Sequence, residues 1–369
     1  MSEPLVVIDA DVLGRHRTGD ETYVAGLLQA LPRVDSGLRF AAITRRPELV
    51  PDGVEPIELR ARVQELRMAA RVPRLLRRLR PALAHFVHAL PPGLPCPGIL
   101  TIQDVSFERD ASLMGRRERA IFRFVVPRSA RRAARVLAIS QRTKDDVVSL
   151  YGLAPEQVVV TPLAVDDDFV PGSQEDSYLL FVSAIEERKN PLAAAAAAEA
   201  VGMRLVAAGP EKDAGLAAEM RRRGVDVRGY VSKEELVRLY QGAACFVFPT
   251  RYEGFGLDVL EAMACGTPVV ATPDAAVKEV GGDAIVYAEP EDFGAGVMQA
   301  LAERDRLVAA GLERAQLFRW ERTARLTIEV YRQRALRLLD ELSPREPARG
   351  RLRTLIQNTA WPRQAAPPP

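Results

Sequence analysis

The chain has 369 residues, of which 47% are hydrophobic and 27% are charged, and its formal net charge is +2. This length favours two domains, and this composition is typical of a globular protein with a hydrophobic core. The near balance of charge argues against a nucleic-acid-binding protein, because contacts to many phosphates need an excess of basic side chains. No run of about 18 apolar residues occurs, so no membrane-spanning helix is predicted.

The start of the chain, MSEPLVVIDADV, carries an acidic residue at Glu3 and passes directly into an apolar run. It lacks the pattern of a secretory signal peptide. The three cysteines, Cys96, Cys245 and Cys265, are not spaced as metal ligands. We therefore expect reduced thiols in a cytoplasmic protein.

In the first half of the chain, short apolar runs alternate with helix-length amphipathic segments. Continuous apolar runs of this kind are typical of buried parallel strands. They predict strands at 5–9, 38–43, 83–87, 98–102, 135–139 and 158–161. Helices are expected at about 20–32, 62–79, 117–134 and 141–151. A polar segment from Asp166 to Ser177, which contains proline and glycine, then predicts a linker.

After the linker the alternation of strand and helix resumes. Strands are predicted at 178–184, 203–209, 225–229, 244–249, 268–272 and 284–288, with helices between them and then up to about residue 342. The pattern predicts two doubly wound α/β domains, residues 1–170 and 171–342, followed by a disordered tail at 343–369. Ligands of such sheets bind at the carboxyl ends of the strands, so the cleft between the domains is the expected site.

One segment, RYEGFGLDVLEAMACGTPVVAT (251–272), places Glu253 and Glu261 on either side of a turn that contains two glycines. Glycines let a ligand approach the backbone closely, and the first N–H groups of a helix have no partner within it. A helix start of this kind binds phosphate. The residues that would form it are Phe255, Gly256 and Leu257.

These residues, in this order and spacing, resemble the retaining glycosyltransferases of family 4, which have the two-domain GT-B fold. The second half matches at 179–191, 205–213 and 228–272, and the first half matches more loosely at 6–31, 101–108, 136–148 and 158–169. The resemblance covers about residues 5–335. It implies two facing Rossmann-like domains, of which the first binds the acceptor and the second a nucleotide-sugar donor. The first-domain motifs lean towards mannosyltransferases of polysaccharide or glycolipid pathways.

The resemblance also assigns roles to charged residues of the second half. Arg188 and Lys189 follow its first strand, and they would stabilise the negative charge that develops on the leaving diphosphate. Glu261 would accept hydrogen bonds from the ribose hydroxyls. Glu253 would contact the donor sugar and support its positive charge, while the leaving phosphate helps to deprotonate the acceptor on the same face.

Four further residues are implied less directly. The backbone at Val231 would contact the nucleobase, and Gly19 would let the donor phosphates approach; a plain loop and a simple helix start are the respective alternatives. The family often has His-Asp where this chain has Gln103 and Asp104. Glutamine can hydrogen-bond to the donor sugar but cannot carry a proton at neutral pH. With this reservation, Gln103 and Asp104 join Glu253 as the predicted catalytic residues.

Some residues depart from the family or suggest another chemistry. Ala184 stands where many relatives have arginine, and Asp258 puts an acid at the phosphate-binding helix start, which is unfavourable unless it points outward. The acidic run 166–168 could suggest a metal, but it lies between the domains, and this fold class usually needs none. His85 and His88 would lie on opposite faces of a strand, which argues against a pair of metal ligands. One of the two could still line the cleft as an acceptor contact.

The sequence therefore predicts a retaining glycosyltransferase that needs neither cofactor nor metal. It would transfer a sugar, with mannose as one candidate, from a GDP- or UDP-linked donor to a glycan, lipid-linked or small-molecule acceptor. Two alternatives stay open: a nucleotide-sugar-binding pseudoenzyme or partner subunit, and a nucleotide-sugar epimerase. No nucleic acid is an expected partner. The arginine-rich segments 62–80 and 116–135 suggest peripheral contact with the anionic inner face of a membrane, for which solvated helix faces are the alternative.

Overall fold

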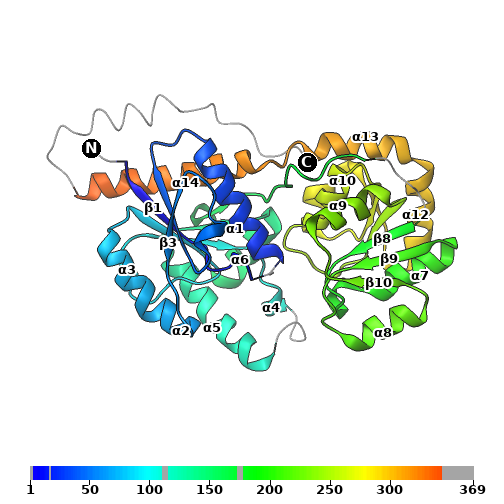
Figure 1. The fold of residues 1–369 in the computed structure, drawn as a ribbon, viewed down its shortest axis with the longest axis horizontal. Helices are drawn as coiled ribbons and strands as arrows, with labels where there is room; N and C mark the ends of the chain where they lie inside the picture. The colour runs from blue at the N-terminus through cyan, green and yellow to red at the C-terminus, as the bar shows by residue number, and fades with distance from the viewer. Residues whose placement is uncertain (1–2, 16–17, 110–114, 173–177, 343–369) are drawn as a thin grey trace.

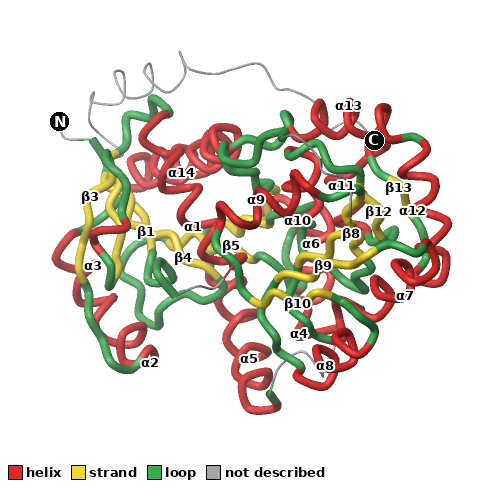
Figure 2. Tube along the Cα trace, turned by 45° about the vertical axis from the view of Figure 1, so that its right-hand side comes forward, coloured by secondary structure: helices red, strands yellow, loops and turns green. Residues whose placement is uncertain are grey.

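Two parallel β-sheets organise the chain, and helices pack on the faces of each (Figures 1 and 2). The computed structural model describes residues 3–15, 18–109, 115–172 and 178–342. Within this part of the chain, the strand pairs that form both sheets are parallel. The predicted fold class, two doubly wound α/β domains, is confirmed.

The first sheet has seven strands in the order β3-β2-β1-β4-β5-β6-β7. The strands are β1 (Leu5–Asp9), β2 (Arg39–Thr44), β3 (Val54–Glu58), β4 (Leu83–Val87), β5 (Gly98–Ile102), β6 (Arg135–Ala138) and β7 (Val158–Val160). The helices between them are α1 (Thr18–Ala30), α2 (Gln64–Leu66), α3 (Val72–Leu79), α4 (Ser106–Arg109), α5 (Arg116–Arg132) and α6 (Gln141–Tyr151). The order reverses between β1 and β4, which is where ligands bind in sheets of this type.

The second sheet has six strands in the order β10-β9-β8-β11-β12-β13. The strands are β8 (Tyr178–Val182), β9 (Arg204–Ala208), β10 (Asp226–Gly229), β11 (Cys245–Phe248), β12 (Val269–Ala271) and β13 (Val286–Tyr287). Its helices are α7 (Pro191–Val201), α8 (Ala214–Arg222), α9 (Lys233–Gly242), α10 (Leu257–Ala264), α11 (Ala275–Gly281), α12 (Phe293–Ala302) and α13 (Arg304–Ala315). Its order reverses between β8 and β11, the two strands that precede Lys189 and Glu253 along the chain.

Strand β3, with the sequence VEPIE, was not predicted from the sequence. It lies at the edge of the first sheet, and three of its five residues are exposed. A proline has no N–H for a strand ladder, so it is tolerated at an edge and disfavoured in the middle of a sheet. The sequence did not predict this strand because a polar, proline-containing segment is not typical of a strand. Such a segment can form a strand only at the edge of a sheet, and the sequence does not show where the edge lies.

The last helix, α14 (Trp320–Leu342), corrects the grouping of residues 171–342 as one domain. Figure 1 shows α14 lying beside α1 on the first domain, and the two helices are in contact. Its Trp320 ring fills the space beside Gly26, where an added Cβ would lie 2.1 Å from the ring. The Tyr331 hydroxyl lies 2.5 Å from Nδ1 of His85 in the first domain. The apolar face of an amphipathic helix must be buried, and only the tertiary structure shows which domain buries it. The predicted tail at 343–369 lies outside the described residues.

Candidate active site

The carboxyl-end loops of the two sheets meet at Gly254. A Cβ added to Gly254 would lie 2.5 Å from the carbonyl oxygen of Gln103 and 3.0 Å from Cβ of Asp104, both in the first domain. On the other side of Gln103, its Oε1 lies 3.2 Å from the position of a Cβ on Gly19, the second residue of α1. The structure therefore brings predicted residues of both domains, including Gly19, Gln103 and Asp104, to one place.

A cluster of buried charges lies next to this contact. Nζ of Lys189 donates to Oε1 of Glu253 at 2.5 Å, and the Thr250 hydroxyl donates to the same oxygen at 2.6 Å. Nη1 of Arg188 is 3.6 Å from this oxygen and donates to the carbonyl of Tyr252 at 2.7 Å. The Lys189 and Glu253 side chains are only 9% and 11% exposed. Three of the predicted residues thus form one compact cluster of two cations and one anion.

Helix α10 starts directly after this cluster. Gly256 precedes it with a φ of 104°, a conformation that favours glycine. Phe255 is buried and packs edge-on against Phe318. The chain therefore enters α10 through a turn anchored by an aromatic ring, with Leu257 as the first residue of the helix. Asp258, in the first turn of α10, interacts electrostatically with Lys189 and Arg188, so both cations lie near a helix start of the kind that binds anions.

Glu261 lies one turn into α10 and is 8% exposed. The Tyr240 hydroxyl donates to its Oε2 at 3.3 Å. Burial, reinforced by the nearby Asp258, raises the pKa of Glu261 well above its usual range. A carboxyl in such a setting gains from hydroxyl donors that replace lost hydration, which suits the predicted contact with a ribose.

Asp258, in the first turn of α10, interacts electrostatically with the charged residues of the site. Burial raises its pKa to about 6; Glu253 also raises this pKa, whereas Lys189 and Arg188 lower it. The side chain thus belongs to the same electrostatic cluster as Lys189 and Glu253. Sequence reasoning recognised that an acid here is unfavourable but could not tell which way it points.

Gln103 and Asp104, the two predicted catalytic residues of the first domain, differ in their hydrogen bonding. Gln103 is 7% exposed, and its Nε2 has no hydrogen-bond partner among the described residues. A buried amide donor without a partner is costly, so this group is available to a ligand oxygen. Asp104, in contrast, accepts from both the backbone N–H and the hydroxyl of Ser106 at the start of α4, at 2.8 and 2.7 Å. Its carboxylate therefore also has a local structural role.

Val231 lies in the loop between β10 and α9. The next residue, Ser232, caps α9 by accepting from the N–H of Glu235. Serine suits this position because its hydroxyl caps the helix. Val231 lies just after the carboxyl end of β10 in the second sheet. The contact of Val231 with a nucleobase stays a prediction.

The two histidines of the first domain have different surroundings. His85 is buried between the Tyr331 and Thr101 hydroxyls, and burial lowers its pKa to about 3. His88 follows β4 with a φ of 62°, which is uncommon for a residue other than glycine, and its Nε2 lies 3.0 Å from Oδ1 of Asp20. Burial opposes the charge of His88, but Asp20 and Asp104 outweigh this effect and raise its pKa.

The acidic run 166–168 is engaged in contacts between the domains. Asp166 accepts from Lys233 of α9 at 2.8 Å and from the Trp320 ring at 2.8 Å, and Asp168 accepts from the same lysine at 3.0 Å. Asp167 pairs with Arg319 at 3.4 Å. Within the described residues no group of three His, Cys, Asp or Glu side chains could hold a metal ion.

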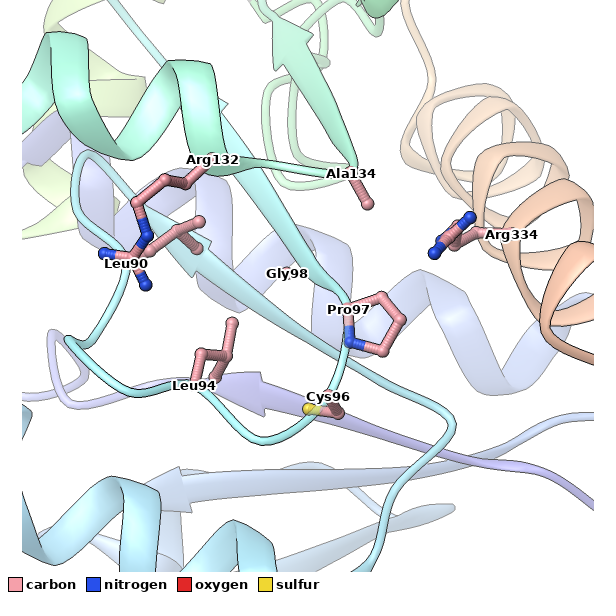
Figure 3. Close-up of a pocket in the computed structure, with 8 residues that line it drawn as sticks. All are labelled: Leu90, Leu94, Cys96, Pro97, Gly98, Arg132, Ala134 and Arg334. Atoms are coloured by element: carbon pink, nitrogen blue, oxygen red, sulfur yellow. The ribbon is translucent and has the colours of Figure 1, made fainter. Parts of the chain in front are cut away.

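A cavity of about 310 Å³ lies at the opposite edge of the first sheet (Figure 3). Gly98, at the start of β5, belongs to its lining, and Arg132 and Arg334 approach it from α5 and α14. It lies at the amino ends of the strands, whereas ligands of such sheets bind at the carboxyl ends. This cavity is therefore separate from the residues gathered around Gly254.

Sequence reasoning missed several residues of this site. Thr250 and Tyr252 were not singled out, although Thr250 holds Glu253 and Tyr252 accepts from Arg188. They lie within three residues of Glu253, which is the only signal that could have found them. Nothing in the sequence could have paired Gly254 with Gln103, because these residues are far apart in the chain.

Two family models match this chain. The model described as Glycosyltransferase Family 4 matches residues 17–169, and the model described as Glycosyl transferases group 1 matches residues 176–303. O-antigen chain mannosyltransferase B of Escherichia coli is 32% identical over 228 residues, which cover 53% of this chain and 60% of that protein. D-inositol 3-phosphate glycosyltransferase of Geodermatophilus obscurus is 32% identical over 235 residues, which cover 54% of this chain and 52% of that protein. The match thus spans little more than half the length of these relatives.

Solved structures extend the likeness over nearly the whole fold. Sucrose-phosphate synthase of Thermosynechococcus elongatus matches with a TM-score of 0.71 at 19% identity, over 89% of this chain and 98% of that one. HepE of Anabaena in complex with UDP-glucose matches with a TM-score of 0.63 at 13% identity, over 92% and 100%. At these identities the likeness concerns the fold alone. None of the helices in the described part of the chain is both long and apolar enough to cross a membrane.

The raised pKa of Asp258 predicts a pH-dependent effect of Asp258→Asn. A carboxyl whose pKa is raised on folding favours the folded state below its unfolded pKa of 3.8, and this contribution is lost as the pH rises through about 6. The substitution should therefore raise the melting temperature at pH 8 and change it little at pH 4. Asp283→Asn, at an exposed position of the same domain, is the control. An equal effect of Asp258→Asn at both pH values would contradict this assignment.

The histidine environments predict two distinct titrations. Only three histidines occur in the chain, so ¹⁵N-histidine NMR spectra can resolve them. His85 should stay neutral at every pH at which the protein is folded, and His88 should keep its proton above its ordinary pKa of 6.5. Asp20→Asn should lower the pKa of His88 and leave that of His85 unchanged. A normal titration of His88 in the unaltered protein would refute the pairing with Asp20.

Proposed function

The chain belongs to the family 4 glycosyltransferases, and from that premise we propose that it transfers a sugar from a nucleotide-sugar donor to an acceptor held mainly by its first domain. One observation carries this proposal. The Lys189–Glu253–Thr250 cluster lies directly before the start of α10, which no side chain of the described residues caps, and beside the first-domain loop at Gln103. Fixed cations, helix N–H groups and a carboxylate thus surround the place where the two domains meet.

The donor diphosphate is bound by the start of α10 together with Arg188 and Lys189. Before the donor binds, Lys189 forms its ion pair with Glu253, so these two buried charges compensate each other. A diphosphate brings new negative charge, and Lys189 can shift towards it. In the transition state the same cations stabilise the phosphate as it leaves with developing charge. With two cations and a helix start in this role, the reaction needs neither metal nor cofactor.

Glu253 acts by stabilising the positively charged sugar and not by attacking it. Its Oε1 already accepts from Lys189 and Thr250, which lowers its strength as a nucleophile. Transfer then proceeds with retention, as the family resemblance implies, and the leaving phosphate takes the proton of the acceptor hydroxyl. Nε2 of Gln103, which has no hydrogen-bond partner within the described part of the chain, offers a hydrogen bond to an oxygen of the donor sugar or acceptor without exchanging a proton.

The donor is linked to GDP or UDP, and mannose is the leading candidate for the sugar. The name of the E. coli relative supports mannose, and the complex of HepE with UDP-glucose supports a nucleotide-sugar donor. The acceptor is a glycan, a lipid-linked glycan or a small molecule. A nucleotide-sugar-binding pseudoenzyme or partner subunit would use the same donor contacts without turnover, and an epimerase would release a changed nucleotide-sugar.

Binding and turnover of the donor test this function. In a thermal-shift screen, a nucleotide at 100 times its Kd should stabilise the protein by about 2.7 kcal/mol. We expect a rise in Tm with either the GDP or the UDP family of ligands. Lys189→Ala should abolish this rise and slow donor turnover at least about tenfold, the equivalent of about 1.4 kcal/mol. Lys212→Ala, at an exposed lysine of the same domain, is the control and should keep both.

Glu253→Gln separates the enzyme from the alternatives. The amide keeps the size of the side chain and an acceptor oxygen but removes the charge, so donor binding should persist while turnover falls at least about tenfold. Donor hydrolysis or transfer in the wild type, detected as released nucleotide, would exclude the pseudoenzyme. Nucleotide binding without any release of nucleotide would favour the pseudoenzyme. Conversion of the nucleotide-sugar into its epimer would favour the epimerase.

A basic, partly apolar edge of the first domain supports contact with the anionic cytoplasmic face of a membrane. Both views place α2 and α5 at the same lower edge of this domain (Figures 1 and 2). Ile121 and Phe124 of α5 are 50% and 55% exposed, and Leu66 of α2 is 52% exposed. The guanidinium of Arg128 lies over the Phe124 ring. Exposed apolar side chains among arginines are the composition that binds anionic lipid surfaces.

Co-sedimentation with vesicles tests this contact. The protein should sediment with vesicles that contain about a third phosphatidylglycerol and much less with pure phosphatidylcholine, because the arginines attract anionic lipid. The double variant Ile121→Ser/Phe124→Ser should lose most of this binding. Met298→Ser, at a similarly exposed apolar residue of the second domain, should not. Absence of binding to the anionic vesicles would leave α5 as a solvated helix face.

A further inference from the structure

The amino end of α6, in the first domain, contacts the loop of the second domain that carries Glu253. The hydroxyl of Ser140, the N-cap of α6, donates to the carbonyl of Gly254 at 2.6 Å. The Thr143 hydroxyl lies 3.2 Å from the same carbonyl and 3.0 Å from the carbonyl of Gln103. The backbone carbonyl next to Glu253 therefore accepts from Ser140 of the other domain, and the single proton of the Thr143 hydroxyl lies between this carbonyl and that of Gln103.

A carboxylate of the second domain completes the cap of α6. The N–H groups of Gln141 and Arg142, the first two residues of the helix, donate to Oε2 and Oε1 of Glu279 at 2.7 and 2.6 Å. The first N–H groups of a helix need partners from outside it, and an anion there is also favoured by the helix dipole. Glu279 belongs to α11, so α6 is fully capped only while the domains are together.

The other side of Glu253 is tied to the same helix. The Tyr252 hydroxyl donates to Oδ2 of Asp146 at 3.1 Å, and Nε of Arg142 donates to that oxygen at 3.0 Å. The Arg142 guanidinium lies over the Tyr252 ring and 3.7 Å from Asp274 of the second domain. Contacts from α6 thus flank Glu253 on both sides, at Tyr252 and at Gly254.

There is no spare room at this junction. A side chain on Gly254 would meet the backbone of Gln103, so the domains can approach this closely only with glycine at that position. The contacts are polar, and polar interfaces between domains separate more readily than apolar ones. Donor and product must enter and leave the cleft, so such an interface suits repeated opening and closing.

We propose that Tyr252, Asp146 and Glu279 are positioning residues that latch the two domains together and set Glu253 against the first-domain loop at Gln103. Their effect on transfer rests on the function proposed above, whereas their effect on domain separation does not. The two interdomain linkers are joined to each other by the N–H of Val165, which donates to the carbonyl of Phe318 at 3.3 Å. Opening of the latch then leaves the domains connected at this hinge.

Two independent changes open the latch. Tyr252→Phe combined with Glu279→Gln removes a hydroxyl and a charge but keeps the size of both side chains. Gly254→Ala removes no interaction and instead pushes the domains apart by its contact with Gln103. The control is Glu211→Gln, which removes an arginine-paired carboxylate inside the second domain. Three quantities are measured on the full chain: the radius of gyration by small-angle X-ray scattering, the Kd for the nucleotide, and kcat and KM for the donor.

The latch predicts a split between binding and turnover. Both the double variant and Gly254→Ala should increase the radius of gyration and lower kcat about tenfold or more, while the Kd for the nucleotide changes less than about threefold. Restoring the carboxylate in Tyr252→Phe alone should recover part of kcat. The Glu211→Gln control should match the wild type in all three measurements.

Other outcomes would overturn the proposal. An unchanged kcat in both latch variants would show that closure does not depend on these residues. A parallel loss of nucleotide affinity, kcat and melting temperature would show that they only stabilise the fold. If the wild type turned over no donor at all, the proposed function would fail, and scattering would still decide the latch: a radius of gyration equal to that of the wild type in both variants would refute it, and an increase would support it.

Discussion

Lys189 and Glu253 are the interaction on which the site depends. Both side chains are almost fully buried, and a charge in such a place is tolerated only when it is paired and hydrogen-bonded. Loss of one partner of a buried pair typically costs about 3–5 kcal/mol, because the other charge is left without solvation. Thr250 and Arg188 complete the arrangement by contacting the same carboxylate oxygen. The pair therefore requires β8 and β11 to lie side by side, which they do at the centre of the second sheet.

The same pair explains why so much polar structure converges on one short loop. Glu253 has Tyr252 on one side and Gly254 on the other, and each of these neighbours contacts α6 of the first domain. The position of a charged side chain is thereby coupled to the position of a whole domain. Under the proposed function, Glu253 supports positive charge only when donor and acceptor are both present, and such coupling would exclude water at the moment of reaction.

Helix α14 and the acidic run 166–168 have a complementary role. The chain crosses between the domains twice, once before β8 and once before α14. Asp166 connects both crossings, since it accepts from Trp320 of α14 and from Lys233 of α9. Carboxylates that look like metal ligands in the sequence thus serve to tie the linkers together. The acidic run thus has a structural role in the contacts of the linkers, and only the folded chain shows these contacts.

The sequence by itself determined the alternation of strands and helices and the two α/β domains, and it singled out Arg188, Lys189 and the Glu253–Glu261 segment, whose role in donor binding stays a prediction. This succeeded because strand length, apolar periodicity and glycine placement are local properties, and because Arg188, Lys189 and the Glu253–Glu261 segment lie close to strand ends. The edge strand β3 was not predicted, because its polar sequence is compatible with a strand only at the edge of a sheet.

Only the tertiary structure decided which distant groups meet. It placed α14 on the first domain, brought Asp258 within electrostatic reach of the charged cluster, left Nε2 of Gln103 without a hydrogen-bond partner among the described residues, and closed Gly254 against the first domain. Each of these depends on contacts between residues far apart in the chain, or on the direction of a side chain within the packed site. Periodicity and spacing along a single chain carry no information about such contacts, because they are selected by packing and burial after the local elements have formed.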